Sequence, residues 1–356
     1  MKALLLAPEL FSSEGGITRI LRIYLKALCE NSGDKDEVRF VSLNDRLVAT
    51  SELRRYSTDR LEGWAVCNRS KWRFVACSFR MGLRSDLIIC GHVAQLPVAW
   101  AISLFRPKLT YYLVAHGIEV WRPFTFLERR ALKGARRIFC VSNYTRLQIL
   151  SNCKMPESKT AVLFNALDPS MVAPSPGSPP GDSNIILSIS RLSVSDSYKG
   201  IEHLIAAMPA VRESIPTARL RIVGRGDGLA PLQKAASRLN ISNAVDFAGY
   251  RSDSELESEF ANCRIFALPS QKEGFGLVYL EAMTHGRPCL GANAGGVAEV
   301  ITEESGLLVE YGDVPGIAAA LILSLKRVWE IGPIVARAQQ FSYGRFKERL
   351  KILLGE

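Results

Sequence analysis

Long apolar runs, closely paired cysteines and a dinucleotide-binding glycine signature are all missing from this sequence of 356 residues. No run approaches the roughly 20 apolar residues that a membrane-spanning helix needs. The run at residues 3–7 is too short for a signal peptide and predicts a first strand instead. The eight cysteines show neither CxxC nor metal-ligand spacing, so we expect reduced thiols in a cytosolic protein.

Acidic residues are scarce in the first half of the chain. The net charge is +10, and residues 1–170 carry 26 Lys and Arg against 15 Asp and Glu, whereas the remainder carries 19 against 20. Such an asymmetry predicts an anionic partner for the first half: membrane lipid, a phosphate-bearing acceptor or nucleic acid.

Short apolar runs alternate with helical patterns in the first half, which predicts a doubly wound parallel sheet. The expected strands are 3–7, 38–43, 87–90, 109–115, 137–141 and 160–163. After the first strand, Gly15 and Gly16 open a helix, and glycine there lets the backbone approach a phosphate closely. Glycine in such a loop is also common turn chemistry, so the pair alone leaves both interpretations open.

A segment rich in proline, glycine and serine, residues 173–183, predicts a linker between two domains. We therefore expect a first domain at 1–172, a second at 184–340 and a terminal amphipathic helix at 341–356. The second domain shows the same alternation, with strands expected at 184–190, 219–223, 245–247 and 264–268.

Residues 69–84 predict a basic amphipathic helix. Trp72, Val75, Ala76 and Phe79 fall on one face, and four arginines gather on another. Such a helix can lie on an anionic bilayer. The alternative is an ordinary helix that packs on the sheet and leaves its arginines in water.

The stretch Pro269–Pro288, PSQKEGFGLVYLEAMTHGRP, carries the clearest chemistry. A buried strand ends at Pro269, a glycine-rich loop follows, and a helix begins at Leu277. The uncapped N–H groups and dipole of such a helix favour an anion. Glu273 and Glu281 bracket the loop, and carboxylates accept hydrogen bonds from sugar hydroxyls. A phosphate cradle beside hydroxyl acceptors suggests a nucleotide sugar.

This stretch resembles the donor-site signature of the family 4 retaining glycosyltransferases. The resemblance implies the GT-B fold, an α/β architecture of two Rossmann-like doubly wound parallel-sheet domains facing across a cleft. It also implies that Glu273 contacts the transferred sugar, that Glu281 binds ribose hydroxyls, and that the turn and helix start approach the sugar and diphosphate. The residues of that turn and helix start are Gly274, Phe275, Gly276, Leu277 and Val278.

The same resemblance assigns roles elsewhere in the chain. Arg191 and Lys199 match an Arg…Lys-Gly element whose cations stabilise the departing diphosphate, and Gly15-Gly16 would touch that diphosphate. His116, in the string HGIE, would contact the sugar hydroxyls. The nucleobase would rest on Gly249, Tyr250 and Arg251.

The expected reaction moves a hexose from a UDP- or GDP-sugar to a hydroxyl acceptor with retention, by front-face attack. The catalytic residues would be His116, Arg191, Lys199 and Glu273, without a metal or other cofactor. Asp34-Lys35-Asp36 has the DxD spacing of metal-dependent transferases, but it lies far in sequence from the donor motifs.

The basic first half favours a lipid-linked acceptor in polysaccharide or cell-envelope assembly, such as a polyprenyl diphosphate glycan. We expect a cytoplasmic protein, soluble or peripheral on the inner face of the plasma membrane, with no nucleic-acid partner. Three alternatives stay open: a nucleotide-sugar epimerase of related fold, a basic nucleic-acid-binding protein, and a membrane-associated scaffold without transferase activity.

Overall fold

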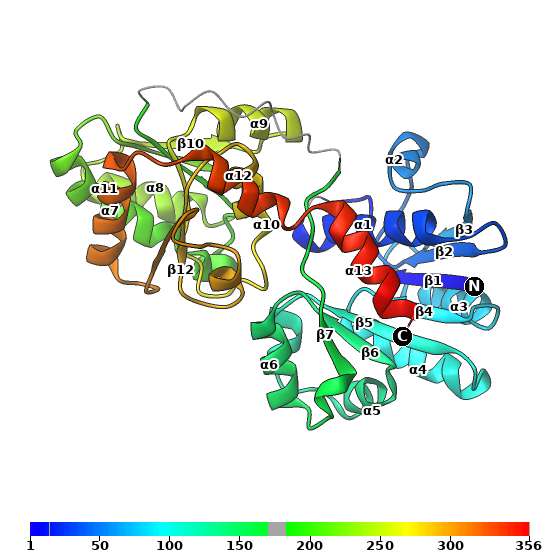
Figure 1. Cartoon of the computed structure of the whole chain (residues 1–356). Helices are drawn as coiled ribbons and strands as arrows, with labels where there is room; N and C mark the ends of the chain where they lie inside the picture. Colours follow the sequence, from blue (N-terminus) through cyan, green and yellow to red (C-terminus); the bar gives the residue numbers. More distant parts are fainter. Residues whose placement is uncertain (14, 170–182, 356) are drawn as a thin grey trace. The chain divides into compact units, whose positions relative to one another are not determined.

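The computed structural model describes residues 1–13, 15–169 and 183–355. The chain divides into two compact units (Figure 1). Unit 1 comprises Met1–Pro169 together with Ser342–Glu356, and unit 2 comprises Ser170–Phe341. Residues 173–182 of the expected linker lie outside the described residues.

Unit 1 is built on a seven-stranded sheet in the order β3-β2-β1-β4-β5-β6-β7. The strands are β1 (Lys2–Ala7), β2 (Glu37–Ser42), β3 (Leu61–Val66), β4 (Leu87–Cys90), β5 (Thr110–Ala115), β6 (Arg137–Cys140) and β7 (Thr160–Val162). All neighbours pair in parallel, and β1 pairs with both β2 and β4. The strand order therefore reverses at β1 and β4, where open α/β sheets place ligands beyond the carboxyl ends.

Helices cover both faces of this sheet. They are α1 (Gly16–Asn31), α2 (Thr50–Arg55), α3 (Lys71–Gly82), α4 (Leu96–Phe105), α5 (Phe126–Gly134), α6 (Asn143–Asn152) and α13 (Tyr343–Gly355). Side chains alternate along each strand, so Leu5 packs toward α1 and α13 while Leu4 packs on the opposite face. Each fully buried leucine contributes about 1.5–3 kcal/mol to folding.

The last helix, α13, belongs to unit 1 although it follows unit 2 in the sequence (Figure 1). Phe346, Leu350 and Leu353 join the core beside α1. The Phe346 ring meets the buried Tyr24 ring edge-on, with centroids 5.0 Å apart. Lys347 donates to Glu30 over 2.9 Å at the edge of this contact.

Unit 2 repeats the architecture with six parallel strands in the order β10-β9-β8-β11-β12-β13. Its strands are β8 (Ile185–Ile189), β9 (Arg219–Val223), β10 (Val245–Gly249), β11 (Ile265–Leu268), β12 (Cys289–Ala292) and β13 (Gly306–Val309). Its helices are α7 (Ile201–Ser214), α8 (Leu229–Arg238), α9 (Asp253–Asn262), α10 (Leu277–Thr284), α11 (Val314–Lys326) and α12 (Ile331–Gln339). The predicted class, two doubly wound parallel sheets, is confirmed.

Three strands lack a clear sequence signal. β3 is an edge strand whose side chains are half-buried or exposed, so LEGWAV shows no apolar run. β12 and β13 are only four residues each, and each contains a glycine. None of the helices in the described residues is long and apolar enough to cross a membrane.

Candidate functional site

Three loops of unit 2 meet at the carboxyl ends of β8, β11 and β12. Gly200 has φ of +75°, and a Cβ there would lie 2.3 Å from the carbonyl oxygen of Pro269. A side chain at position 200 would therefore push the first loop off the second. Alongside, the Gln271 N–H donates to the Tyr198 carbonyl over 2.8 Å. These contacts bring Lys199 against the loop that carries Glu273.

The third loop closes on the backbone of Glu273. Gly295 has φ of +63°, and a Cβ there would lie 2.3 Å from the Glu273 carbonyl oxygen. The N–H of Gly296 donates to that same oxygen over 2.8 Å. Close packing thus requires a glycine at position 295, and these two contacts hold the backbone of Glu273 against the third loop.

Lys199 and Glu273 form an ion pair with 2.6 Å between Nζ and Oε2, and their side chains are 17% and 18% exposed. Burial opposes the charge on Lys199, but the Glu273 carboxylate outweighs it and raises the pKa of Lys199. The ammonium of Lys199 is therefore charged, and two of the predicted catalytic residues lie side by side.

The start of α10 is open to an anion. Gly276 caps it with φ of +97°, where a Cβ would lie 2.5 Å from a ring carbon of Tyr279. No side chain caps this helix and no acidic residue lies in its first turn, which includes Leu277 and Val278. The first N–H groups and the helix dipole are thus available to a phosphate.

Two further predicted residues of this stretch are buried. The Phe275 ring packs edge-on against Phe341 at 5.4 Å and is almost fully buried. Its side chain therefore anchors the loop, and only its backbone is left for a ligand. Glu281, in the second turn of α10, is 6% exposed.

Arg191, predicted beside Lys199, pairs with Asp196 at 3.2 Å while its own side chain remains largely exposed. The Tyr198 hydroxyl donates to the same carboxylate over 3.0 Å. Asp196 thus holds the η4 segment (Val194–Lys199) together between the two cations. The sequence pattern did not single out Asp196, because an aspartate in a polar loop carries no signal of its own.

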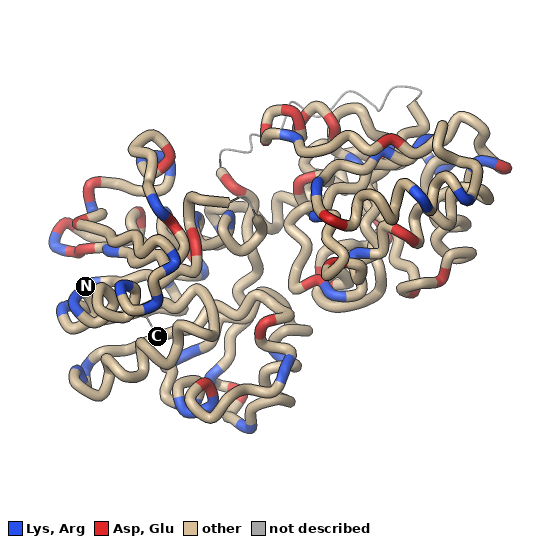
Figure 2. Tube along the Cα trace, turned by 180° about the vertical axis from the view of Figure 1, so that it is seen from behind, with Lys and Arg blue, Asp and Glu red and all other residues tan. Residues whose placement is uncertain are grey.

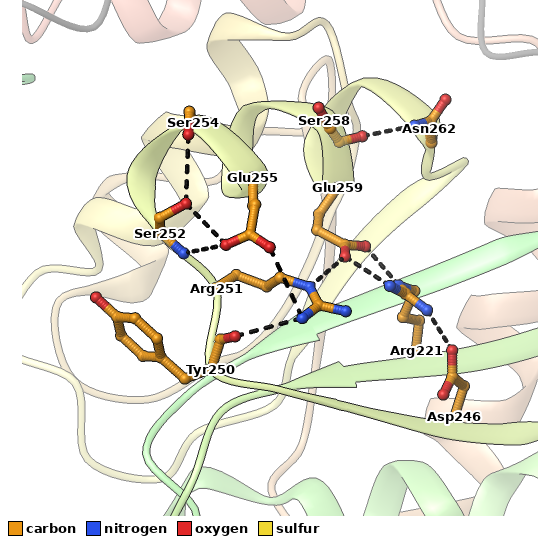
Figure 3. Close-up of polar contacts among 10 residues, drawn as sticks. All are labelled: Arg221, Asp246, Tyr250, Arg251, Ser252, Ser254, Glu255, Ser258, Glu259 and Asn262. Atoms are coloured by element: carbon orange, nitrogen blue, oxygen red, sulfur yellow. Dashed lines mark hydrogen bonds and ion pairs between the residues drawn. The ribbon is translucent and has the colours of Figure 1, made fainter.

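Of the residues predicted to bind the nucleobase, Arg251 is held by ion pairs within unit 2, and Tyr250 is exposed (Figure 3). Arg251 points at Glu259, with 3.2 Å between Nε and Oε1, and Arg221 shares that carboxylate. Hydrogen bonding to Arg221 lowers the pKa of Glu259. The Tyr250 ring points away from this network (Figure 3) and is 53% exposed. Arg251 is thus engaged within unit 2, and Tyr250 is the group open to a ligand.

Arg225, in the loop after β9, was missed by the sequence analysis. Its guanidinium carbon lies 4.7 Å from the centroid of the Tyr250 ring. A cation over one face of a tyrosine leaves the other face for a planar group. Arg225 belongs to the string GRGDG at residues 224–228, but nothing in the spacing of that string indicates that Arg225 reaches Tyr250.

His116 lies in unit 1 at the carboxyl end of β5. Its Nε2 lies 2.8 Å from the Gly91 carbonyl, which can only accept, so Nε2 carries the proton. Burial lowers the pKa of His116, so the ring is neutral. Among the described residues its Nδ1 is buried without a hydrogen-bond partner. A buried acceptor in this state suits a ligand hydroxyl. The His116 N–H donates to Glu119, whose carboxylate orders the turn.

The loop between β1 and α1 carries Gly15 and Gly16. A Cβ at either position would meet nothing within 4 Å, and Gly15 has an extended φ of −168°. Neither glycine is therefore required by packing or by backbone strain. Open space at the start of an uncapped helix is the feature that an approaching phosphate needs.

Asp45 holds the loop between β1 and α1 by hydrogen bonds to its backbone, a role that the sequence analysis did not predict. Its carboxylate is fully buried and accepts the N–H groups of Leu10, Phe11 and Ser12 over 2.8–3.0 Å. The Ser42 hydroxyl donates a fourth hydrogen bond over 2.5 Å.

Arg22 holds the same loop from α1. Its Nε donates to the Leu10 carbonyl over 2.5 Å, and its guanidinium lies 5.7 Å from the rings of both Phe11 and Tyr56. An arginine on the buried face of a helix is the only sequence signal that could have indicated this role.

The described residues contain no group of three or more His, Cys, Asp and Glu placed to hold a metal ion. Asp34 of the DxD string pairs with Arg60 at 2.5 Å, and Asp36 accepts the Gly33 N–H over 2.8 Å. Both carboxylates are thus engaged in local structure.

Curated relatives include a GDP-mannose-dependent α-(1-6)-phosphatidylinositol monomannoside mannosyltransferase of Mycolicibacterium smegmatis. It is 31% identical over 250 residues, 64% of either chain. A monoacylated-substrate counterpart from Corynebacterium glutamicum is 37% identical over 131 residues, 35% of this chain and 34% of its own. The chain thus matches less than two thirds of the length of these relatives.

Solved structures match over the whole chain. Anabaena HepE in complex with UDP has a TM-score of 0.79 at 21% identity, with all of both chains covered. The lipopolysaccharide outer core galactosyltransferase WaaB has a TM-score of 0.74 at 18% identity, again with all of both chains covered. At these identities the likeness shows the fold.

Two family models divide the chain between them. The model described as Glycosyltransferase Family 4 matches residues 15–171, and the one described as Glycosyl transferases group 1 matches residues 174–328. Together with the two doubly wound sheets and the full-length structural matches, they show that the chain belongs to glycosyltransferase family 4 and has the GT-B fold.

Proposed function

We propose that this protein is a retaining glycosyltransferase that moves a hexose from a nucleoside diphosphate sugar to a hydroxyl acceptor. The observation that carries the proposal is the ion pair of Lys199 and Glu273 beside the uncapped start of α10. This arrangement offers a cation and N–H groups to a diphosphate, and a carboxylate to sugar hydroxyls, within one set of loops.

The chemistry would depend on the leaving group. Lys199, Arg191 and the N–H groups at the start of α10 would stabilise the diphosphate as the glycosidic bond breaks. Glu273 would orient the sugar, and the lone pair on Nδ1 of His116 would accept a hydrogen bond from a sugar hydroxyl. The proposal requires no metal, since these groups can neutralise the diphosphate themselves.

The relatives support GDP-mannose as one donor to test and the UDP-bound neighbour supports UDP-sugars as another. For the acceptor we propose a lipid-linked hydroxyl compound in cell-envelope or polysaccharide assembly. The mannosyltransferase relatives act on phosphatidylinositol mannosides, and the basic first half of this chain suits an anionic lipid. We further propose that the protein works in the cytoplasm at the inner face of the membrane.

Thermal unfolding in the presence of UDP, GDP, ADP or dTDP tests the donor site. A nucleotide at a hundredfold excess over its dissociation constant should stabilise the protein by about 2.7 kcal/mol. Glu281→Gln should abolish that shift while preserving the shape of the buried side chain. If no nucleotide raises the melting temperature, with or without Mg²⁺, the proposal is wrong.

Product stereochemistry tests the reaction. The donors are the nucleotide sugars that carry the nucleotide found to raise the melting temperature, and lipid extracts are the acceptors. NMR of the product's anomeric proton should show the α-configuration of the donor. A β-linked product would contradict retention. Release of an epimerised sugar without an acceptor would instead indicate an epimerase.

A further inference from the structure

The GRGDG string after β9 packs against the backbone that follows Arg191. The Gly228 N–H donates to the Leu192 carbonyl over 2.7 Å. Two residues further on, the Val194 N–H donates to the carboxylate of Asp227 over 3.0 Å. The backbone next to Arg191 is thus held by a neighbouring loop, and the direction of the Arg191 side chain depends on what the side chain itself contacts.

Asp196 gives that side chain its direction. Its carboxylate lies 3.2 Å from Nη2 of Arg191 and is largely buried, whereas the Arg191 side chain is 76% exposed. The contact engages one end of the guanidinium. Because a guanidinium carries several N–H donors in a rigid plane, the rest of the group is left for a phosphate.

Tyr198 connects Asp196 to the second cation. Its hydroxyl donates to Asp196 over 3.0 Å, and burial raises the pKa of Tyr198, so the hydroxyl keeps the proton that it donates. The ammonium of Lys199 lies 5.5 Å from the centroid of the Tyr198 ring, a distance at which a cation is attracted to the face of a ring. The ring would therefore hold Lys199 when sugar hydroxyls occupy Glu273.

Positive charge gathers at these loops although unit 2 has no excess of it. Residues 170–341 contain 15 Lys and Arg against 18 Asp and Glu, and the two colours are interspersed over unit 2 in Figure 2. Beside the Tyr198 ring, however, the ammonium of Lys272 lies 5.9 Å from the ring centroid, in addition to that of Lys199. Together with Arg191 this makes three cations in the loops before the uncapped start of α10, an arrangement that suits an anionic ligand.

We propose that Asp196 and Tyr198 are positioning residues, which align Arg191 and Lys199 on the terminal phosphate of the bound nucleotide. In the reaction, the bond between the anomeric carbon and an oxygen of that phosphate breaks, and its electron pair passes to the oxygen. The acceptor oxygen forms the new bond to the anomeric carbon and gives its proton to the departing diphosphate. Two cations that are already held in place stabilise the developing charge without first being reoriented. This inference rests on the proposed function, since it concerns the leaving group of that reaction.

The alternative role for Asp196 is that of a competitor, which would hold Arg191 away from a phosphate. A competitor would cover the guanidinium, but most of the Arg191 side chain is exposed. Asp196 also has a second partner in Tyr198, so its position does not depend on Arg191 alone. Both observations favour an anchor.

Calorimetric titration of the full chain with UDP, UMP, GDP and GMP tests the inference. The ratio of the dissociation constant of a monophosphate to that of its diphosphate isolates the contact with the terminal phosphate. Asp196→Asn should lower this ratio about tenfold, because it weakens the charge-assisted anchor of Arg191. Tyr198→Phe keeps the ring and removes only the hydroxyl, so it should lower the ratio about threefold. Monophosphate affinity should not change in either variant, which also shows that both variants fold.

A double-mutant cycle gives a readout that a merely structural role would not move. If Asp196 acts through Arg191, Asp196→Asn should lower the ratio no further in a protein that already carries Arg191→Gln. A structural role for Asp196 would instead add its loss to that of Arg191→Gln.

Matched controls come from unit 1. Asp86→Asn changes an aspartate that lies 3.8 Å from Arg106 at the amino end of β4. Tyr343→Phe removes a hydroxyl that donates to Glu30 over 2.9 Å. Both should bind the four nucleotides like the native protein.

Three results would overturn the inference while leaving the proposed function intact. Asp196→Asn keeps the native ratio, it weakens monophosphate and diphosphate binding equally, or it binds the diphosphate more tightly than the native protein does. Additive losses in the double-mutant cycle would also overturn it. If the native protein binds none of the four nucleotides, the proposed function itself fails, and the inference fails with it.

Discussion

The ammonium of Lys199 lies 2.6 Å from the carboxylate of Glu273, although the two residues are 74 positions apart in the sequence. The two groups neutralise each other in a setting that is largely closed to water. An arriving nucleotide sugar would replace both partners at once, since its diphosphate is a better partner for the lysine and its hydroxyls suit the glutamate. Under the proposed function, contacts with the nucleotide sugar would thus take the place of the ion pair.

Removing one member of this pair should destabilise the protein. Glu273→Gln leaves a largely buried ammonium without its carboxylate, which should cost about 3 kcal/mol of unfolding free energy. Combining it with Lys199→Met should recover most of that loss. Glu157→Gln, which breaks an exposed pair with Arg146, should cost no more than about 1 kcal/mol. Urea denaturation of the four proteins checks this, and equal losses for the two glutamate variants would contradict it.

The substitution Gly16→Ala tests whether Gly16 is needed for binding the diphosphate or only for the conformation of the turn. Because a Cβ would meet nothing within 4 Å, the folded state should be unchanged or up to about 1 kcal/mol more stable. The added methyl should nevertheless crowd the diphosphate and raise the dissociation constant of the nucleotide sugar about tenfold, or 1.4 kcal/mol.

Gly332→Ala, at a similarly open position early in α12, should leave nucleotide affinity unchanged. Calorimetric titration of both variants gives the comparison. If Gly16→Ala binds the nucleotide sugar like the native protein, the glycine serves only the turn.

Asp45→Asn should loosen the loop between β1 and α1. Asparagine has one acceptor oxygen in place of two, and its amide N–H would face backbone donors, so we expect a loss of about 2–3 kcal/mol. Asp59→Asn changes a side chain that is 83% exposed and should stay within about 0.5 kcal/mol. Nucleotide affinity should fall only in the first variant. Equal stability of the two variants would show that the buried carboxylate does not organise the loop.

His285 should make the protein sensitive to mild acid. Burial, with a smaller effect of Arg287, lowers the pKa of His285 to about 4, against about 6.5 in the unfolded chain. The neutral His285 ring therefore makes its full contribution to the free energy of unfolding above pH 6.5. As the pH falls through 4, this contribution is lost, which lowers the free energy of unfolding by about 2–3 kcal/mol.

His285→Phe should retain the stacking on Phe260, where the ring centroids are 5.5 Å apart, but should flatten this part of the profile. Unfolding free energies of the native protein and the variant between pH 7 and pH 4, a window set by the two pKa values, provide the test. Parallel profiles would exclude His285 as the source.

The sequence predicts those parts of the fold that depend on local pattern. Six strands of unit 1 and the helix that begins at Leu277 follow from apolar runs and glycine positions, because burial on both faces leaves a continuous signal. β3 escaped prediction because an edge strand is only half covered. The inward face of α3 was also hard to predict, because two of its three buried residues, Ser78 and Gly82, are neither large nor apolar.

Local pattern also identifies residues better than it identifies their partners. The string around Glu273 pointed to a site, but the pairing with Lys199 depends on Gly200 lying against Pro269. The binding of a nucleobase by Arg251 stays a prediction, and its sequence pattern did not indicate the pairing with Glu259 of α9. Asp45 has no motif at all. Contacts between distant segments depend on how the sheets pack, which no single stretch of sequence contains.

The return of α13 to unit 1 has a consequence for biosynthesis. Phe346, Leu350 and Leu353 complete a core whose other members are translated more than 170 positions earlier. While the ribosome makes unit 2, the surface of α1 around Tyr24 stays uncovered and exposed to other nascent chains. Unit 1 is thus the first unit to be synthesised, but its core is complete only when α13 has been made. Completion of that core therefore depends on the synthesis of all of unit 2.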